Sequence, residues 1–215
     1  MAYNSFEVIL FDLGGVLMEL ELYPRMSQWL KQSLTEEEFG RRWLLSPAVR
    51  AFESGSMNAA EFSEALVAEL ELTIAPERFL AEFSGFIKGF YPGAVQLVKR
   101  LQTTYRVGCF SNTNVIHWER FVGEAGIDKL FDPALLSFEL GLLKPDPEAF
   151  AAIVERLGCQ PRQILYFDDN PLNVAAGEQA GLYTLRTVGI EEVQAHLVRL
   201  GLLSELEIAA IAEAG

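Results

Sequence analysis

Carboxylates follow two apolar runs of the sequence, at the points where buried strands would end. Asp12 comes directly after residues 8–11, and the pair Asp168–Asp169 comes directly after residues 164–167. Because the carboxyl ends of parallel strands meet at one edge of an open α/β sheet, we expect the three acids to lie close together. Three unpaired anions repel strongly, so a cation is expected among them, and hard oxygen ligands favour Mg²⁺.

Two other polar segments would reach the same edge. Ser111 and Asn112 end a further apolar run, and Lys144 lies next to Pro145, just before a helix that is predicted to start at Pro147. The Ser111 hydroxyl could bind phosphate oxygens, and Lys144 adds a second positive charge. Each segment alone has an ordinary explanation, such as a helix cap, a turn or a solvated lysine. Together they predict phosphoryl transfer, in which a carboxylate can attack phosphorus directly and give an aspartyl-phosphate that water then hydrolyses.

In this order, the four polar segments resemble the sequence motifs of the haloacid dehalogenase superfamily. The matching residues are 11–17, 110–113, 144–145 and 166–170. The resemblance covers nearly the whole chain, and the segment after the first motif resembles the helical cap of the subgroup that holds haloacid dehalogenases and many sugar-phosphate phosphatases. Residues 46–55 resemble a cap segment of small bacterial phosphatases acting on glucose 1-phosphate. The resemblance implies a hydrolase, namely a Mg²⁺-dependent phosphatase of small phosphorylated metabolites, sugar phosphates among them.

The resemblance also implies a role for each polar residue. Asp12 would be the nucleophile, and Lys144 would steady both the nucleophile and the phosphate. Ser111 would bind the phosphoryl group, and Asn112 would contribute backbone or side-chain contacts. The implied metal ligands are Asp12, the backbone carbonyl of Gly14, Asp168 and Asp169, with Asp169 binding the ion more directly than Asp168.

Position 14 departs from the pattern of typical phosphatases in this superfamily. They carry a second Asp two residues after the nucleophile, which protonates the leaving oxygen and then activates water. General acid–base help of this kind contributes roughly 10²–10⁴-fold, and Gly14 has no side chain to provide it. Three explanations are open: another group, for instance on the cap, takes the role; the substrate has a good leaving group; or the protein is a weak enzyme that mainly binds.

The same departure leaves two alternative functions open. In a 2-haloacid dehalogenase, Asp12 would attack carbon and displace halide without a metal, which is compatible with Gly14. The Asp168–Asp169 pair argues against this alternative, because a metal-free displacement has little use for a metal-type pair of acids. The other alternative is a non-catalytic relative that keeps the fold and the phosphate-binding site.

Alternating strands and helices must position these residues. The alternation implies a parallel sheet with right-handed crossovers, so we predict an α/β fold with a Rossmann-like core. Residues 1–18 and 90–215 would form this core, and residues 19–89 would form an inserted all-helical cap in which no strand is expected. An insert after the first strand would hang over the carboxyl edge of the sheet, where a lid is useful. Capping-box sequences at residues 35–38 and 58–61 predict two helix starts in the cap.

Composition limits the partners of the chain. Half of the 215 residues are hydrophobic, but no apolar run reaches about 18 residues, so no membrane span is predicted. With 17 basic and 30 acidic residues the formal net charge is −13, which disfavours nucleic acid. The expected partner is a small-molecule phosphate ester, bound by a monomer or a homodimer. Because there is no signal-peptide pattern and the two cysteines suit a reducing compartment, we expect a cytoplasmic location.

Several other side chains are expected to serve structure. Cys109 and Cys159 are interpreted as buried thiols, and His117 and His196 as structural histidines without partners at metal-ligand spacing. The aromatic residues of the insert are expected to form the apolar core of the cap. Three arginines of the insert could reach an anionic substrate, although such side chains are more often solvated or paired: Arg41, Arg42 and Arg50.

Overall fold

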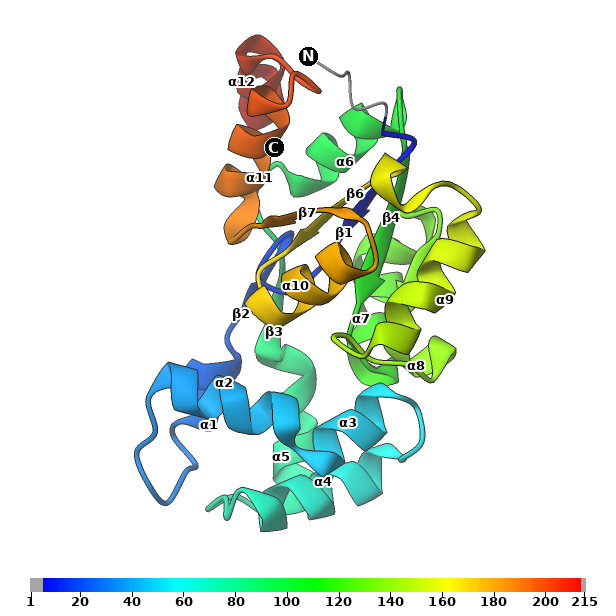
Figure 1. Ribbon diagram of the computed structural model, residues 1–215. Helices are drawn as coiled ribbons and strands as arrows, with labels where there is room; N and C mark the ends of the chain where they lie inside the picture. The colour runs from blue at the N-terminus through cyan, green and yellow to red at the C-terminus, as the bar shows by residue number, and fades with distance from the viewer. Residues whose placement is uncertain (1–5, 214–215) are drawn as a thin grey trace.

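The computed structural model describes residues 6–213 and has a five-stranded parallel sheet at its centre (Figure 1). The strand order is β5-β4-β1-β6-β7. The strand bounds are Val8–Phe11 for β1, Arg106–Ser111 for β4, Ala134–Leu136 for β5, Ile164–Asp168 for β6 and Tyr183–Arg186 for β7. The predicted α/β fold is confirmed, and the strands that lead to Asp12, Ser111 and Asp168 are neighbours in the sheet.

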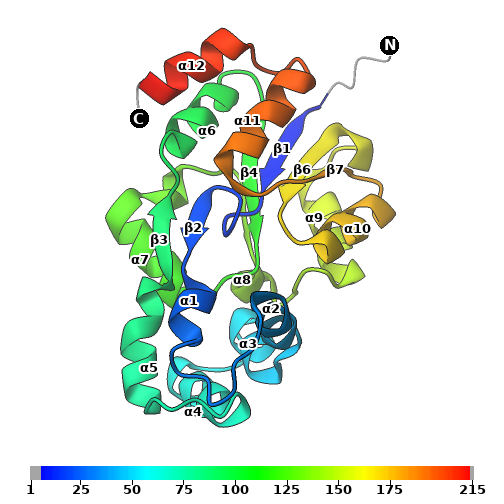
Figure 2. The same cartoon turned by 90° about the vertical axis from the view of Figure 1, so that its left-hand side faces the viewer.

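Helices cover both faces of the sheet (Figure 2). Successive side chains of a strand point to opposite faces, so Ile9 and Phe11 pack with α6, α7, α11 and α12, whereas Val8 and Leu10 pack with α9 and α10. All four side chains are at most 2% exposed, which makes β1 the buried centre of the core. The helix bounds are Ala94–Gln102 for α6, Val115–Ala125 for α7, Ser137–Leu140 for α8, Pro147–Leu157 for α9, Pro171–Gln179 for α10, Gly189–Arg199 for α11 and Glu205–Glu213 for α12.

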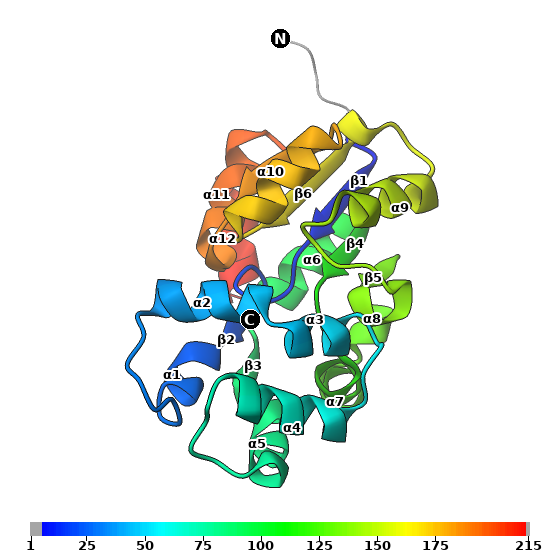
Figure 3. The same ribbon diagram turned by 60° about the horizontal axis from the view of Figure 1, so that its bottom comes forward.

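Five helices follow the first strand and lie beyond the carboxyl ends of the sheet strands (Figure 3). They are α1 Leu22–Met26, α2 Glu36–Leu45, α3 Pro47–Glu53, α4 Ala59–Glu69 and α5 Pro76–Phe83. Both predicted capping boxes are present: Thr35 exchanges hydrogen bonds with Glu38, and Asn58 exchanges them with Glu61. The helices share their own apolar core, built on aromatic side chains such as Phe62, which is 1% exposed.

A two-stranded antiparallel hairpin joins these helices to the sheet domain. It pairs β2, Met18–Leu20, with β3, Ile87–Phe90. The prediction that residues 19–89 contain no strand is therefore wrong. These strands are short and half-exposed, and about 70 residues of sequence separate them, so no local sequence pattern predicts them. We propose that the core and the cap meet at this hairpin, at residues 18/19 and 89/90.

The remaining elements are three short 3₁₀ turns: Ser84–Phe86, Ile127–Lys129 and Pro161–Gln163. Within residues 6–213, no helix has both the length and the apolar character needed to cross a bilayer. Both cysteines are free, and Cys109 is buried as expected. Cys159 is only partly buried, which corrects the prediction of two buried thiols, because it lies in the connection between α9 and β6.

Candidate active site

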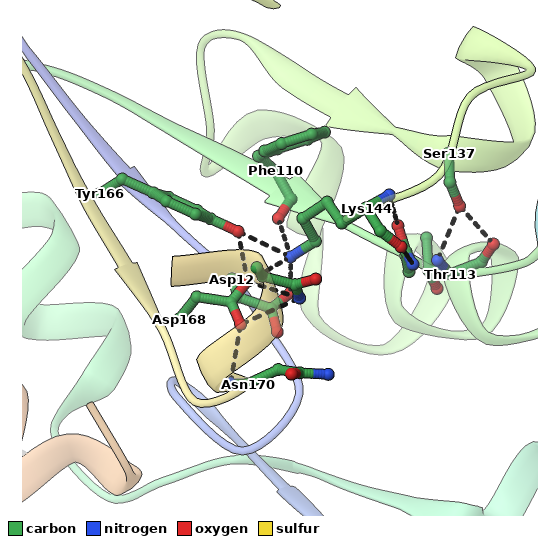
Figure 4. Close-up of polar contacts among 10 residues, drawn as sticks. Asp12, Phe110, Thr113, Ser137, Lys144, Tyr166, Asp168 and Asn170 are labelled. Carbon is green, nitrogen blue, oxygen red and sulfur yellow. Dashed lines mark hydrogen bonds and ion pairs between the residues drawn. The ribbon is translucent and has the colours of Figure 1, made fainter. Parts of the chain in front are cut away.

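The carboxyl ends of β1 and β6 bring three acids together. The Asp12 backbone N–H still pairs with the Phe167 carbonyl at 2.8 Å, so the side chain of Asp12 is presented directly at the end of the sheet. Asp12, Asp168 and Asp169 each offer one oxygen, and these oxygens lie within 4.8 Å of one another. Figure 4 shows Asp12 and Asp168 converging beside Lys144. The strand order therefore assembles residues that are more than 150 positions apart in the sequence.

Lys144 is the buried cation of the site, with 1% of its surface exposed. Its ammonium donates to the Phe110 carbonyl at 2.8 Å and to Asp168 Oδ2 at 2.7 Å, and lies 3.0 Å from Asp12 Oδ1. It also contacts the Tyr166 hydroxyl at 2.9 Å. Burial alone would lower the pKa of Lys144, but the two carboxylates outweigh it and raise the pKa above its usual value. Lys144 is therefore charged, and its contact fixes one oxygen of Asp12.

The side chain of Asn112 hydrogen-bonds to the backbone of Lys144. Its Oδ1 accepts from the Lys144 backbone N–H at 2.9 Å, and its Nδ2 donates to the Lys144 carbonyl at 2.9 Å. This two-point contact holds the loop that carries Lys144, so the amide of Asn112 acts on the site through that loop. Ser111, by contrast, ends β4 and lines the same cavity as Asp12.

The two acids of the pair differ in their surroundings. Asp168 is fully buried, and its oxygens accept from Lys144, from the Tyr166 hydroxyl and from the Asn173 amide at 3.0 Å, with the Asn170 backbone N–H at 2.9 Å. Asp169 is only partly buried and faces Gly15. Gly15 has φ +75°, and a Cβ there would lie 2.6 Å from Asp169 Oδ2, so this close approach requires glycine.

The donor set fits a divalent cation. Three carboxylates face one lysine, so two negative charges are not balanced. Burial raises the pKa of Asp12 to about 7, with Lys144 opposing and the neighbouring acids adding to the rise. Burial and Asp168 likewise raise the pKa of Asp169 to about 6. Bringing a hard cation among these oxygens would favour their charged forms.

A cavity of about 290 Å³ opens from the acids toward the cap. Asp12, Ser111, Lys144 and Asp169 line it from the sheet domain, together with residues of α7, and the hairpin and the cap helices α1, α2, α3 and α5 contribute further lining residues. Its outer walls are largely apolar, with Leu20, Leu22, Trp43, Leu44 and Phe86 among the lining residues. The space therefore suits a phosphate held at the acids and a small organic group held under the cap.

None of the three cap arginines lines this cavity. Arg50 pairs with Asp146 at 2.6 Å, and Arg41 and Arg42 lie on a separate hollow beside Glu38. Their possible contact with an anionic substrate is thus not supported in this conformation. His117 lines the cavity but is bonded through both ring nitrogens, as a structural histidine would be.

Glu53 is the residue that sequence reasoning did not single out. It is the last residue of α3 and lines the same cavity as Asp12 and Lys144. Burial raises the pKa of Glu53 to about 7; Asp12 adds to the rise, and Lys144, Arg50 and a hydrogen bond with Trp43 oppose it. The only signal in the sequence was its place in the cap segment 46–55, because a single acid on a short helix has no periodic pattern.

Comparisons with known proteins agree with this geometry. Residues 6–181 match the family model of haloacid dehalogenase-like hydrolases. The chain is 26% identical over 187 residues to D-ribitol-5-phosphate phosphatase of Bacteroides thetaiotaomicron, covering 83% of this chain and 90% of that protein. It is also 23% identical over 198 residues to (S)-2-haloacid dehalogenase of Xanthobacter autotrophicus, covering 86% and 76%.

Solved structures give the same assignment. A crystal structure of a HAD family enzyme from Bacteroides thetaiotaomicron matches with a TM-score of 0.70 and 26% identity, covering 91% of this chain and 99% of that one. The magnesium complex of that enzyme matches with a TM-score of 0.70, 25% identity and the same coverage. The family match spans most of the sequence and includes the strand ends that carry Asp12, Ser111 and Asp168, so the chain belongs to the haloacid dehalogenase-like hydrolases.

Proposed function

We propose that this hydrolase is a Mg²⁺-dependent phosphatase of small phosphorylated metabolites. The observation that carries the proposal is the cluster of Asp12, Asp168 and Asp169 around a buried lysine. One lysine balances only one of the three carboxylates, so the site can bind a divalent cation. The names of the relatives support it, since D-ribitol-5-phosphate phosphatase is among them. So does the magnesium complex of the similar Bacteroides enzyme.

The chain's own residues suggest how the phosphoryl group is transferred. Lys144 contacts Oδ1 of Asp12, which leaves Oδ2 to form the bond to phosphorus as the bond to the leaving oxygen breaks. Ser111 and the Lys144 ammonium would bind the oxygens of the transferring group. Water then attacks the aspartyl-phosphate and restores Asp12.

We propose that Mg²⁺ is held by Asp12, Asp169 and the Gly14 carbonyl, with Asp168 contributing mainly through Lys144, Asn170 and Asn173. The ion would neutralise charge on the phosphate and polarise its oxygens. This division of labour differs from a symmetrical pair of acids, because Asp168 already accepts hydrogen bonds on both oxygens.

The cavity limits the substrate to a small ester. A volume of about 290 Å³ holds a phosphate and a compact organic group, sugar phosphates included. We further propose that the protein works in the cytoplasm, as a monomer or a homodimer.

A 2-haloacid dehalogenase is the competing function, and the likeness to the Xanthobacter enzyme favours it. The cluster of carboxylates weighs against it, because a metal-free displacement would leave crowded buried acids without a purpose. A non-catalytic relative would keep the same cluster but turn over no substrate.

The test is a panel of phosphate esters with Mg²⁺ or with chelator, read by phosphate release. We expect turnover of at least one ester that requires Mg²⁺. Chloride release from a 2-chloroacid in the presence of chelator, with no phosphate release from the panel, would instead establish the dehalogenase. Inorganic phosphate binding without turnover would establish the non-catalytic relative.

A further inference from the structure

We propose that Glu53 of the cap performs the proton transfers for which Gly14 has no side chain. It would protonate the leaving oxygen and then accept a proton from the attacking water. This inference rests on the proposed phosphatase function and names the group that completes the reaction. The packing of α3, its contacts with the core and the chemistry of the cavity support this role.

The packing of α3 fixes which side of the helix faces the site. Phe52 is 3% exposed and stacks on Phe62 with ring centroids 4.2 Å apart, inside the cap core. Ser46 caps the helix by accepting from the Val49 N–H at 3.1 Å. With Phe52 turned inward, Glu53 is carried to the neighbouring side of the helix, next to the cavity.

Two contacts anchor the end of α3 to the core on either side of Glu53. Arg50 pairs with Asp146 at 2.6 Å, only two residues beyond Lys144. Gly55 has φ +75°, and a Cβ there would lie 2.5 Å from the Phe138 carbonyl of α8. Figure 3 shows α3 beside α8. Since both anchors lie within three residues of Glu53, its backbone is held at the mouth of the site.

Elimination among the cavity residues leaves Glu53 as the proton carrier. Of the described residues that line the cavity, five have side chains that titrate as acids or bases: Asp12, Glu53, His117, Lys144 and Asp169. Asp12 is the nucleophile and Asp169 the proposed metal ligand. Lys144 is paired with Asp12 at 3.0 Å and with Asp168 at 2.7 Å, so it keeps its proton and serves as the cation of the site. His117 has both ring nitrogens bonded, to Asn114 and to the Phe83 carbonyl.

The carboxyl group of Glu53 can account for both proton transfers of the reaction. In the first step the Asp12 oxygen bonds to phosphorus, the ester P–O bond breaks, and the protonated Glu53 gives its proton to the leaving oxygen. In the second step water bonds to phosphorus, its proton passes to the Glu53 carboxylate, and the Asp12–phosphorus bond breaks. Both carboxyl groups return to their starting states.

The experiment compares Glu53→Gln with the wild-type enzyme on an alkyl phosphate and on p-nitrophenyl phosphate. We expect turnover of the alkyl ester to fall roughly 10²–10⁴-fold. With p-nitrophenyl phosphate the leaving group needs no proton, so we expect a rapid burst of nitrophenolate of about one per active site, followed by a slow phase limited by dephosphorylation. Glu64→Gln, which removes an exposed carboxylate from α4, is the matched control and should behave as wild type.

A second substitution tests whether an acid at position 14 can replace Glu53 as the proton carrier. In the Glu53→Gln background, Gly14→Asp should restore part of the alkyl phosphatase rate. The atoms nearest to a Cβ at Gly14 belong to the Leu20 side chain, with both methyl groups at 3.2 Å. That side chain is 41% exposed, so it can shift by the few tenths of an ångström that the substitution requires. If Glu53→Gln does not fold, Glu53→Ala with added formate replaces it, and restoration of turnover by formate is the expected result.

Three results would overturn the inference. Wild-type rates in Glu53→Gln would remove any role for the side chain, and an equal loss on both esters without a burst would reduce it to a structural role. Failure of formate to restore the turnover of Glu53→Ala would likewise leave Glu53 with a structural role only. A wild-type enzyme that hydrolyses no ester with Mg²⁺ would instead refute the proposed function itself, so the two failures are distinguishable.

Discussion

The buried histidine at the junction of cap and core should make stability depend on pH. His117 is 7% exposed; its Nε2 lies 2.9 Å from the Phe83 carbonyl, and its Nδ1 lies 3.0 Å from the Asn114 amide nitrogen. A carbonyl only accepts, so Nε2 carries the proton, and Nδ1 accepts from the amide. Protonating Nδ1 would set two donors against each other inside the protein, so the geometry holds one neutral tautomer.

The size of the effect follows from the two pKa values. Burial lowers the pKa of His117 to about 4, reinforced by Arg120 and opposed by the hydrogen bond to Phe83, against 6.5 for an ordinary histidine. Below pH 6.5 the unfolded chain binds a proton that the folded chain does not, so stability falls with pH until the folded pKa is reached. The difference between the two pKa values corresponds to a loss of roughly 3 kcal/mol in the free energy of unfolding once the pH has fallen to the folded pKa.

The assay is urea unfolding of wild type and His117→Gln from neutral pH down to about pH 4. Carboxylates titrate in both proteins, so the difference between the two free energies of unfolding isolates the histidine. We expect the advantage of wild type to shrink by roughly 3 kcal/mol over this range. The same substitution at the partly buried His196 of α11 serves as the control. A difference that stays constant with pH would refute the neutral, buried state of His117.

Two other predictions concern the charges of the site. Lys144→Met leaves two buried carboxylates without their cation, so we expect a loss of about 3–5 kcal/mol in the free energy of unfolding measured in chelator; a loss below about 1 kcal/mol would contradict the buried ion pairs. Gly15→Ala pushes a Cβ against Asp169, so we expect strain of about 1–2 kcal/mol and a several-fold higher Mg²⁺ concentration for half-maximal activity. Gly123→Ala, in α7 with no atom within 4 Å of the new Cβ, is its control and should change neither quantity adversely.

The sheet and its acids were predictable because local signals carried them. Residues 8–11 and 164–167 are continuous apolar runs, both are fully buried, and each is followed at once by an acid. Parallel pairing then brings the strand ends together without further information. Two helix starts of the cap were equally readable, because a capping box places both partners within four residues of sequence.

Contacts between distant segments were not predictable. The hairpin pairs Met18 with Phe90, and neither strand has a pattern of its own. Glu53 lies three residues from Arg50, which contacts the core through an ion pair with Asp146, 96 residues away in the sequence. Because Arg50 is engaged in this ion pair, it does not line the cavity, and the sequence alone could not predict this. Asn112 likewise acts on the Lys144 backbone, a contact that exists only once both loops are folded.

The most direct test of the central claim is to trap the phosphoryl group on Asp12. The enzyme is mixed with p-nitrophenyl phosphate and Mg²⁺, quenched during turnover, and reduced with borohydride, which converts an aspartyl-phosphate to homoserine. Peptide mass spectrometry should find homoserine at position 12 and at no other acid, and Asp12→Asn should give neither the product nor turnover. Mg²⁺-dependent turnover with an unmodified Asp12, or turnover that survives Asp12→Asn, would contradict the account.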